Sequence, residues 1–465
     1  MQQLSGLDAA FIHQESASTP MHVSAVLVYS PHERSGKSLN SEALAKVLLS
    51  ASRHIPFLTQ KLKTLPMGID EPYWARDNNF EVNDHITERR LPTPGNWQQL
   101  KQCFAELHCK RLDRTRPLWH AALVTGLDDC NDIPKGSIAL VLKVHHACID
   151  GVSLAAMVAT MHKAEANSDV CVPAAIELDD YELWNRAGIK SWTRPFKFAN
   201  TVSNLLPKML QGSDDEAVCL GSDISHQQTI LNARVSRKRV LGAVRLPWSE
   251  IVQLKRNVRR VTFNDIALAI VSGALRSYLT RHGKLPAKSL VAGAPMSLRN
   301  REDASHGNKL ATLQVGLATD LEDPVERLRA IHQYAVRGKK KLNAMGSGTI
   351  MDISDSMAPA ALAEGLRALS FASTRIADIP VPFHVMVSNV PGPSQPLDLQ
   401  GWPLHSLMGF GPIRHTMGLF HIVTQTEYEQ SISFVSCDSI LPDAEFYEQC
   451  LQDSFLELCH ASDNY

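Results

Sequence analysis

Two adjacent histidines, His145 and His146, are the residues of this sequence best suited to chemistry. They follow the apolar run 138–144 (IALVLKV) and open the pattern HHxxxDG, which ends at Asp150 and Gly151. The unperturbed pKa of an imidazole is about 6.5, so a histidine at the end of a strand can take a proton from a hydroxyl near neutral pH. That proton transfer is the step needed to move an acyl group onto an alcohol.

The sequence gives weaker support to other roles for the same run. Only one of two neighbouring strand residues faces a given channel, because side chains alternate, and a buried structural histidine stays an alternative. A metal is not expected, because no further histidine or cysteine cluster has ligand spacing. Cys148 and Ser153 are possible nucleophiles, but a nearby histidine in the sequence is weak support for a covalent intermediate. We expect direct transfer, with no metal and no bound cofactor.

The composition is that of a globular protein with two domains. The 465 residues exceed the size at which one hydrophobic core stops growing. Lys and Arg (47) balance Asp and Glu (48), which argues against the broad basic surface of a nucleic-acid-binding protein. The nine cysteines form no Cys-x-x-Cys pair, and the sequence shows neither a signal peptide nor ~18 consecutive apolar residues. We therefore expect a cytoplasmic, non-secreted protein whose contact with a membrane or lipid droplet is peripheral.

Helical and strand patterns alternate in two halves of similar length. The first half predicts strands at 23–29, 118–124 and 138–144 and helices at 41–52, 100–110 and from 152; the second predicts strands at 240–246, 290–294, 312–318, 383–388, 419–426 and 431–436 and helices at 264–279, 324–342 and 443–458. This alternation predicts a layered α/β fold. We expect a first domain at 1–180, a crossover linker at 181–235 and a second domain at 236–465.

Residues 190–210 combine basic side chains with large apolar ones such as Trp192 and Phe196. That mixture suits a segment that lies on a lipid surface. Pro195 and Pro207 are expected to interrupt any single helix there. A linker packed across the two domains is the alternative.

Four further motifs accompany the HHxxxDG run. The first combines LSGLDA at 4–9 with PMHV at 20–23, and the other three, in order along the chain, are PLW at 117–119, ND at 264–265 and SNVPGP at 388–393. Together they resemble the bacterial wax ester synthase/diacylglycerol acyltransferase family. The HHxxxDG run alone indicates only the wider CoA-dependent acyltransferase superfamily, which includes chloramphenicol acetyltransferase and the condensation domains of nonribosomal peptide synthesis.

The resemblance implies a fold and an activity. The fold is two chloramphenicol-acetyltransferase-like domains with mixed sheets and flanking helices, and an active-site channel at their interface. The activity is transfer of a long-chain fatty acyl group from acyl-CoA, as a substrate, to a long-chain alcohol, giving wax ester, or to diacylglycerol, giving triacylglycerol. Two alternatives stay open: a condensation-like enzyme that uses a carrier-protein thioester, and a non-catalytic lipid-binding protein of the same fold.

The resemblance also implies roles within the HHxxxDG run. His146 is the general base, and His145 has a supporting role. Asp150 braces the loop by pairing with an arginine, for which Arg299 is a candidate. Gly151 is expected to let the chain turn into the following helix.

The remaining motifs have both a binding and a structural interpretation. Pro117, Leu118 and Trp119 are expected to line a substrate channel or to pack in the core. Ser388 or Asn389 is a candidate donor to the developing oxyanion, or part of a rigid turn. For Asn264 and Asp265 (the ND motif) we expect helix capping by the Asn side chain, with the Asp in the first turn.

Overall fold

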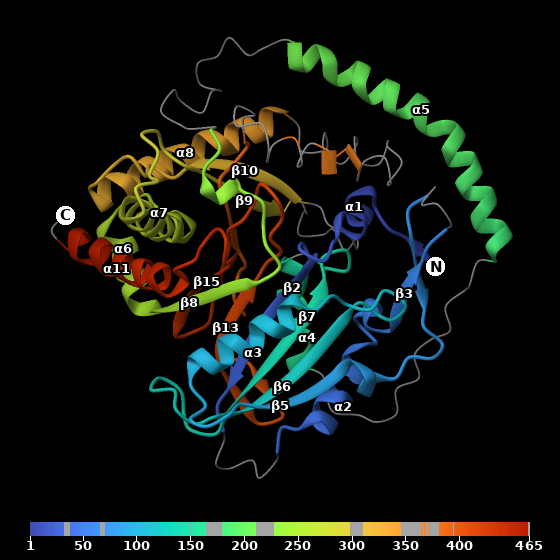
Figure 1. The fold of residues 1–465 in the computed structure, drawn as a ribbon, viewed down its shortest axis with the longest axis horizontal. Helices are drawn as coiled ribbons and strands as arrows, with labels where there is room; N and C mark the ends of the chain where they lie inside the picture. Colours follow the sequence, from blue (N-terminus) through green and yellow to red (C-terminus); the bar gives the residue numbers. More distant parts are fainter. Residues whose placement is uncertain are drawn as a thin grey trace.

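Two six-stranded sheets with flanking helices form the body of the protein (Figure 1). The computed structural model describes residues 1–31, 38–65, 70–149, 151–163, 179–210, 227–297, 310–345, 381–393 and 395–463, with positions 364, 365, 367, 368 and 372. Asp150 and Arg299 lie outside these residues, so their predicted pairing stays a prediction.

The first sheet carries the histidine run at the end of a buried strand. Its order is β12-β13-β2-β7-β6-β5, with β2 at His22–Tyr29, β5 at Ile86–Arg90, β6 at Trp119–Leu127, β7 at Ser137–His145, β12 at Asp398–Leu399 and β13 at Trp402–Phe410. Every residue of β2 and β7 is buried, which explains their nearly continuous apolar sequences. The strands predicted at 23–29 and 138–144 are thereby confirmed.

Helices cover both faces of this sheet. Phe104 of α3 (Trp97–Cys109) meets Phe410, which pairs with Ser24 in the sheet. His162 of α4 (Gly151–Lys163) meets Tyr29. Positions 24 and 29 differ by an odd number, so these two helices lie on opposite faces. Helix α2 (Ser41–Ala51) contacts α4 and belongs to the same side.

The second sheet is mixed. Its order is β10-β9-β11-β14-β15-β8, with β8 at Arg239–Pro247, β9 at Val291–Ser297, β10 at Leu310–Gly316, β11 at Val385–Asn389, β14 at Phe420–Gln425 and β15 at Glu429–Cys437. Strand β11 runs parallel to both neighbours, and the other pairs are antiparallel. The flanking helices are α6 (Trp248–Asn257), α7 (Phe263–Arg281), α8 (Pro324–Met345) and α11 (Ala444–Ser462). Helix α7 is apolar almost all round because it contacts α8 and α11 as well as α6.

A strand from the second half of the chain completes the first sheet. Strand β13 pairs antiparallel with β2, with Leu407 opposite Leu27 and Gly409 opposite Ala25. Neighbouring strands β14 and β15 contact β13 from the second sheet. The predicted domain boundaries stay a prediction, and any division of the chain has to account for this crossing strand.

Helix α5 (Asp180–Leu210) runs along the outside of the molecule in an arc (Figure 1). The expectation that Pro195 and Pro207 break this segment is wrong, because both lie inside one helix. A proline removes a backbone hydrogen bond and can bend a helix without ending it. Among the described helices, none is both long and apolar enough to cross a membrane.

A small sheet holds one side of α5. It consists of β1 (Gln2–Gln3), β4 (Tyr73–Arg76) and β3 (Gln60–Lys63). Leu183 and Ala187 of α5 are fully buried against Leu65 and Tyr73. Helix α1 (Gly6–Gln14) follows β1 and leads into the first large sheet.

Candidate active site

His145 is the last residue of β7 and is completely buried. The backbone N–H of Ala147 donates to its Nδ1 at 3.1 Å, so this nitrogen is an acceptor. A ring whose Nδ1 accepts is neutral and carries its proton on Nε2. Burial lowers the pKa of His145 well below its usual value, and the neighbouring groups His22, Arg114 and His146 lower it further. His145 is therefore a fixed part of the turn rather than a proton acceptor.

His146 lies one residue beyond the strand and is only half-buried. Its backbone N–H donates to the carbonyl of Met21 at 2.8 Å, which fixes the chain where it leaves the sheet. Its ring stacks on Phe11 of α1, with the ring centroids 4.2 Å apart and an angle of 21°. The contact with Phe11 and the hydrogen bond to Met21 of the PMHV motif thus position this imidazole. The HHxxxDG run then enters α4, which begins at Gly151.

A buried carboxylate that sequence reasoning missed lies behind the histidines. Glu15 Oε1 is 4.0 Å from His145 Nε2, and the Glu15 side chain is 1% exposed. Arg114 donates to Glu15 Oε2 from Nε at 3.2 Å and from Nη2 at 2.8 Å, and also to the carbonyl of Ile12 at 2.6 Å. Glu15 and Arg114 are 99 positions apart, so no local pattern could have paired them. Together they form an ion pair that supports the turn.

The PLW motif divides between the loop and the core. Leu118 packs in a small cluster with Leu4, Ile12 and Ala147, directly beneath the histidine turn, and its carbonyl accepts from the N–H of His145 at 3.0 Å. Trp119 points into the main core instead. Its Nε1 donates to the carbonyl of Leu58 at 2.9 Å. Pro117 is buried beside them, and a substrate-binding role for the three stays a prediction.

The ND and SNVPGP motifs meet each other in the second half. Asn389 Nδ2 donates to Asn264 Oδ1 at 3.5 Å, at the end of β11 and the start of α7. The expected cap by the Asn264 side chain is wrong. Thr262 is the capping residue, and Asp265 completes a capping box by accepting from the Thr262 N–H at 2.8 Å. The ND pair lies two residues further into the helix than we expected, because a capping box places its acid at the third helical residue.

Asp265 has a second partner and Ser388 lies in the sheet. His332 Nδ1 is 2.9 Å from Asp265 Oδ2 and ties α8 to the start of α7. Ser388 is half-buried and pairs with Ile422 in register. An oxyanion role for Ser388 or Asn389 stays a prediction.

Covalent catalysis by Cys148 finds no support in the structure. Burial, and then the charge of Asp8, raise the pKa of the Cys148 thiol well above its usual value. The thiolate is the nucleophilic form of cysteine, so this environment makes an acyl-cysteine unfavourable. Across the described residues, no group of three or more His, Cys, Asp or Glu side chains is arranged to hold a metal.

Two cavities lie near the first sheet. A cavity of about 470 Å³ separates the halves, between α3, β8, β13 and α11, and is lined by side chains such as Phe104, Leu241 and Met408. Its described lining includes no residue of the HHxxxDG run. A second cavity of about 260 Å³ lies beside Pro117, Trp119 and Lys143. Neither of these two cavities has His146 in its described lining, so the channel that leads to His146 stays a prediction.

Comparison with known proteins gives consistent matches. Residues 4–267 match the family model described as wax ester synthase/diacylglycerol acyltransferase catalytic domain, and residues 306–459 match the model of its C-terminal domain. A probable diacylglycerol O-acyltransferase of Mycobacterium tuberculosis is 32% identical over 407 residues, 84% of this chain and 84% of that protein. The O-acyltransferase WSD of Acinetobacter baylyi is 26% identical over 456 residues, 95% of this chain and 93% of that protein.

The fold is also shared with a solved structure. The wax ester synthase/diacylglycerol acyltransferase from Marinobacter aquaeolei matches with a TM-score of 0.70 and 23% identity, and the match covers 100% of both chains. The α/β fold with mixed sheets and flanking helices is therefore confirmed, as is the relationship predicted from the motifs.

Proposed function

This chain belongs to the wax ester synthase/diacylglycerol acyltransferase family, and we propose that it is an O-acyltransferase. The proposed reaction moves a long-chain fatty acyl group from acyl-CoA to a long-chain alcohol, to diacylglycerol or to both. The relatives named for diacylglycerol O-acyltransferase activity support the second acceptor. Acyl-CoA acts as a substrate and not as a resident cofactor.

The different surroundings of the two imidazoles carry this proposal. His145 is buried and neutral, and its ring accepts a backbone hydrogen bond, whereas His146 is half-buried just beyond the end of the strand. His146 takes the proton of the acceptor hydroxyl while that oxygen attacks the thioester carbonyl. The resulting imidazolium then protonates the departing CoA sulfur, so the ring returns to its starting state. A positioned base of this kind contributes ~10²–10⁴-fold to the rate.

Substrate positioning supplies a further part of the rate. Well-oriented reactants reach effective molarities of ~10⁵ M or more, provided that the reacting groups are held in place. Phe11 and the Met21 carbonyl hold His146, and Glu15 with Arg114 supports the turn behind it.

An assay of purified protein tests the proposal. Palmitoyl-CoA is supplied with hexadecanol or with dioleoylglycerol, and released CoA and neutral lipid are both measured. We expect stoichiometric CoA and ester with at least one acceptor. Ester formation only from a carrier-bound palmitoyl thioester would establish the condensation-like alternative. Lipid binding without turnover of any donor would establish the non-catalytic one.

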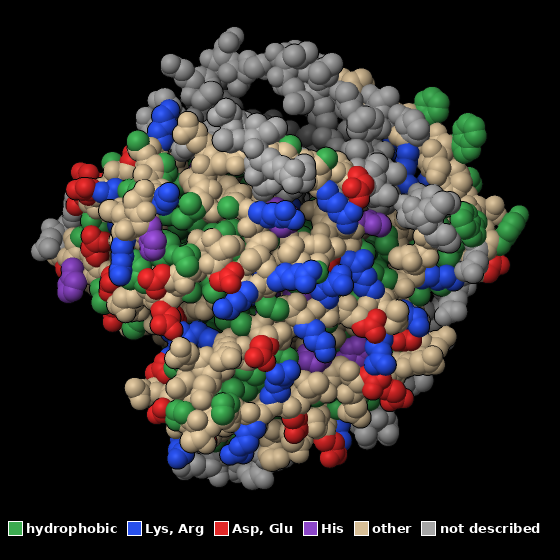
Figure 2. Space-filling view, viewed as in Figure 1, with side chains coloured by type: hydrophobic (Ala, Val, Ile, Leu, Met, Phe, Trp, Pro, Cys, Tyr) green, Lys and Arg blue, Asp and Glu red, His purple; other side chains and the backbone are tan. Residues whose placement is uncertain are grey.

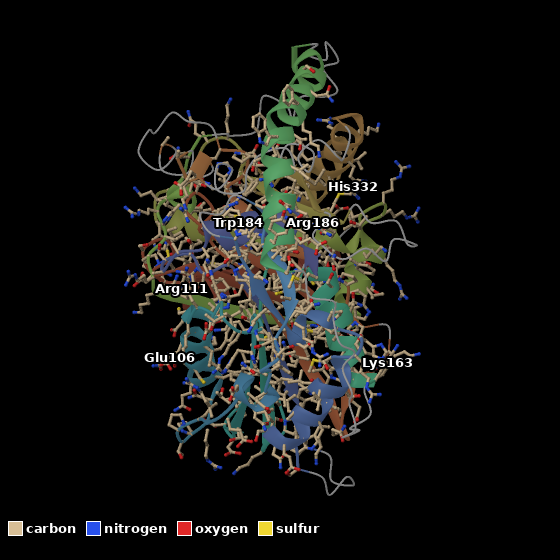
Figure 3. All side chains as sticks on the ribbon, turned by 90° about the vertical axis from the view of Figure 1, so that its right-hand side faces the viewer. Glu106, Arg111, Lys163, Trp184, Arg186 and His332 are labelled. Carbon is tan, nitrogen blue, oxygen red and sulfur yellow. The ribbon has the colours of Figure 1, made fainter. Side chains whose placement is uncertain are left out.

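Contact with a lipid surface is the second part of the proposal, and α5 supplies it. Tyr181, Trp184, Ile189, Trp192 and Phe196 are between 43% and 81% exposed. At 3.6 residues per turn, these side chains fall on one side of the helix. Figure 2 shows apolar side chains projecting at the upper right, where Figure 1 places α5, and Figure 3 shows Trp184 and Arg186 on this helix.

The opposite side of α5 is fixed to the protein. Arg194 is 8% exposed and donates to Asp70 at 2.9 Å and to Glu71 at 2.5 Å, and Lys190 lies 3.5 Å from Asp70. A helix that is anchored on one side and apolar on the other is suited to lie on a membrane or lipid droplet.

Flotation with liposomes that contain diacylglycerol tests this contact. Trp192→Ser with Phe196→Ser is expected to reduce the floated fraction without changing thermal stability, because both side chains are exposed. The control is Tyr428→Ser, which removes a 70% exposed aromatic ring from a strand connection. Equal flotation of the α5 variant and the wild type would rule the contact out.

A further inference from the structure

The cavity of about 260 Å³ beside the first sheet is strongly cationic. Among the described lining residues, Arg89, Lys110, Arg111, Arg116 and Lys143 are basic, and two, Asp84 and Asp113, are acidic. Figure 2 shows Lys and Arg side chains gathered across the middle of this face, and Figure 3 places Arg111 and Glu106 on the same side of the molecule. A concave surface lined by one sign of charge concentrates ligands of the opposite sign.

Lys143 is a buried cation among these lining residues. It is 4% exposed, and its Nζ donates to the carbonyls of Leu107 at 2.7 Å and Lys110 at 2.6 Å, near the end of α3. An ammonium has three N–H donors, so two carbonyls leave one donor for a further acceptor. Among the described residues, no carboxylate lies within ion-pair distance of Lys143 or Lys110 or Arg111. The acids of the cavity are occupied elsewhere, because Asp84 and Asp113 lie 2.9 Å and 3.9 Å from Arg116.

The titration of the neighbouring groups agrees with an excess of positive charge. Burial lowers the pKa of Lys143 to about 8, and Lys110 adds to the effect. Burial also lowers the pKa of His120 to about 4, with further contributions from Lys143, His85, Lys110 and Arg89. An anion in the cavity would relieve this repulsion.

We infer that the cavity beside Lys143 binds phosphate groups, and that these are the phosphates of the acyl-CoA donor. The second half of this inference rests on the proposed function. Lys143 lies two residues before the end of β7 and His146 one residue beyond it, so about 10 Å of chain separates them at most. The extended pantetheine arm of CoA spans that distance. Phosphates bound beside Lys143 would therefore leave the thioester within reach of the imidazole.

Kinetics with a full and a truncated donor test the assignment. In Lys110→Gln with Arg111→Gln, two exposed side chains lose their charge, and we expect the KM for palmitoyl-CoA to rise about tenfold or more. The kcat, and all constants for S-palmitoyl pantetheine, which has no phosphate, are expected to stay unchanged. The control, Arg256→Gln with Arg259→Gln, removes the same charge from exposed positions on and just after α6, and its KM is expected to stay that of the wild type.

A binding measurement separates this inference from the proposed function. Calorimetry with adenosine 3′,5′-bisphosphate should show binding to the wild type that the cavity variant loses and the control keeps. Such binding in a protein that transfers no acyl group would overturn the proposed function and leave the phosphate site standing. Acyl transfer with an unchanged KM in the cavity variant would overturn the CoA assignment. If that variant also floats less than the wild type with anionic vesicles, but equally well with neutral vesicles, the phosphate belongs to a lipid headgroup.

Discussion

Each half of the molecule has a six-stranded sheet with flanking helices, and one histidine from each sheet region shows two different placements. In the first half, His146 stands just beyond the end of β7, half-buried against Phe11. In the second half, His421 lies within β14 with no exposed surface, and its Nε2 is 2.8 Å from the hydroxyl of Tyr447. Burial lowers the pKa of His421 to about 3. The difference teaches that a buried histidine inside a strand serves the fold, whereas a partly exposed one just beyond the strand end is available for chemistry.

The first half also contains structural histidines, which lie directly behind the site. His22 pairs with His145 across β2 and β7, and its Nε2 donates to the carbonyl of His108 at 2.5 Å. Burial lowers the pKa values of His22 and His145 well below the usual range and that of His108 to about 3. The comparison is therefore sharpest between His146 and its buried neighbours.

Acid should destabilise the fold through these buried histidines. A histidine that stays neutral when folded binds more protons when unfolded, so stability rises with pH between the folded pKa and about 6.5. Lowering the pH from 6.5 to 5 should cost each of these buried histidines up to about 1.4 kcal/mol per pH unit, the limit reached when the unfolded imidazole is fully protonated. Urea unfolding at both pH values measures the loss. A free energy of unfolding that does not change with pH would contradict the neutral, buried assignment.

Glu15→Gln tests the support behind the site. The change leaves Arg114 without its carboxylate and loosens the turn that carries both histidines, so we expect kcat to fall ~10-fold to 10²-fold. The control is Asp77→Asn, which removes another buried carboxylate. Asp77 lies 2.9 Å from Lys61, a residue of β3 in the small sheet. A kcat that falls equally in both variants would show general destabilisation rather than positioning.

His421→Phe should lower stability but leave the chemistry intact. The substitution leaves the buried Tyr447 hydroxyl without its partner, which costs about 1–3 kcal/mol in the free energy of unfolding. The double variant with Tyr447→Phe should recover most of that loss, because both polar partners are then gone. The kcat per folded molecule is expected to remain that of the wild type. A lower kcat per folded molecule in His421→Phe would show that this histidine affects the chemistry, which would contradict the contrast between His421 and His146.

Gly392→Ala probes the SNVPGP turn as a packing element of the second half. A Cβ at this position would come within 1.9 Å of the Gln425 carbonyl oxygen, so the backbone must shift. We expect a loss of ~1–3 kcal/mol in thermal or urea unfolding. Gly188→Ala on α5 is the control, because nothing lies within 4 Å of its added Cβ. Equal stability of the two variants would show that the turn tolerates movement.

The histidine run was recognisable from the sequence because its information is local. An apolar strand, two imidazoles and an Asp-Gly turn occupy adjacent positions, and the structure ends β7 and begins α4 where this pattern predicts. The Glu15–Arg114 pair was not recognisable, because its two residues come together only through tertiary packing.

Two elements were not predicted correctly from the sequence, each for a physical reason: strand β13 was missed, and helix α5 was expected to be interrupted. Strand β13 (WPLHSLMGF) contains Pro403 and Gly409, which weaken a strand pattern. A side chain at Gly409 would approach Ile422 to 2.7 Å, so the glycine permits close packing between β13 and β14. In α5, Pro195 and Pro207 stand within a helix that tertiary contacts from Leu183, Ala187 and Arg194 hold in place.

The most direct test of the account is the rate of palmitoyl transfer by His146→Ala, measured beside its unfolding curve. The side chain is half-buried and stacks on one aromatic ring, so the fold should persist. We predict a loss of ~10²–10⁴-fold in kcat with an unfolding midpoint close to that of the wild type. Wild-type turnover in this variant would contradict the assignment of His146 as the general base.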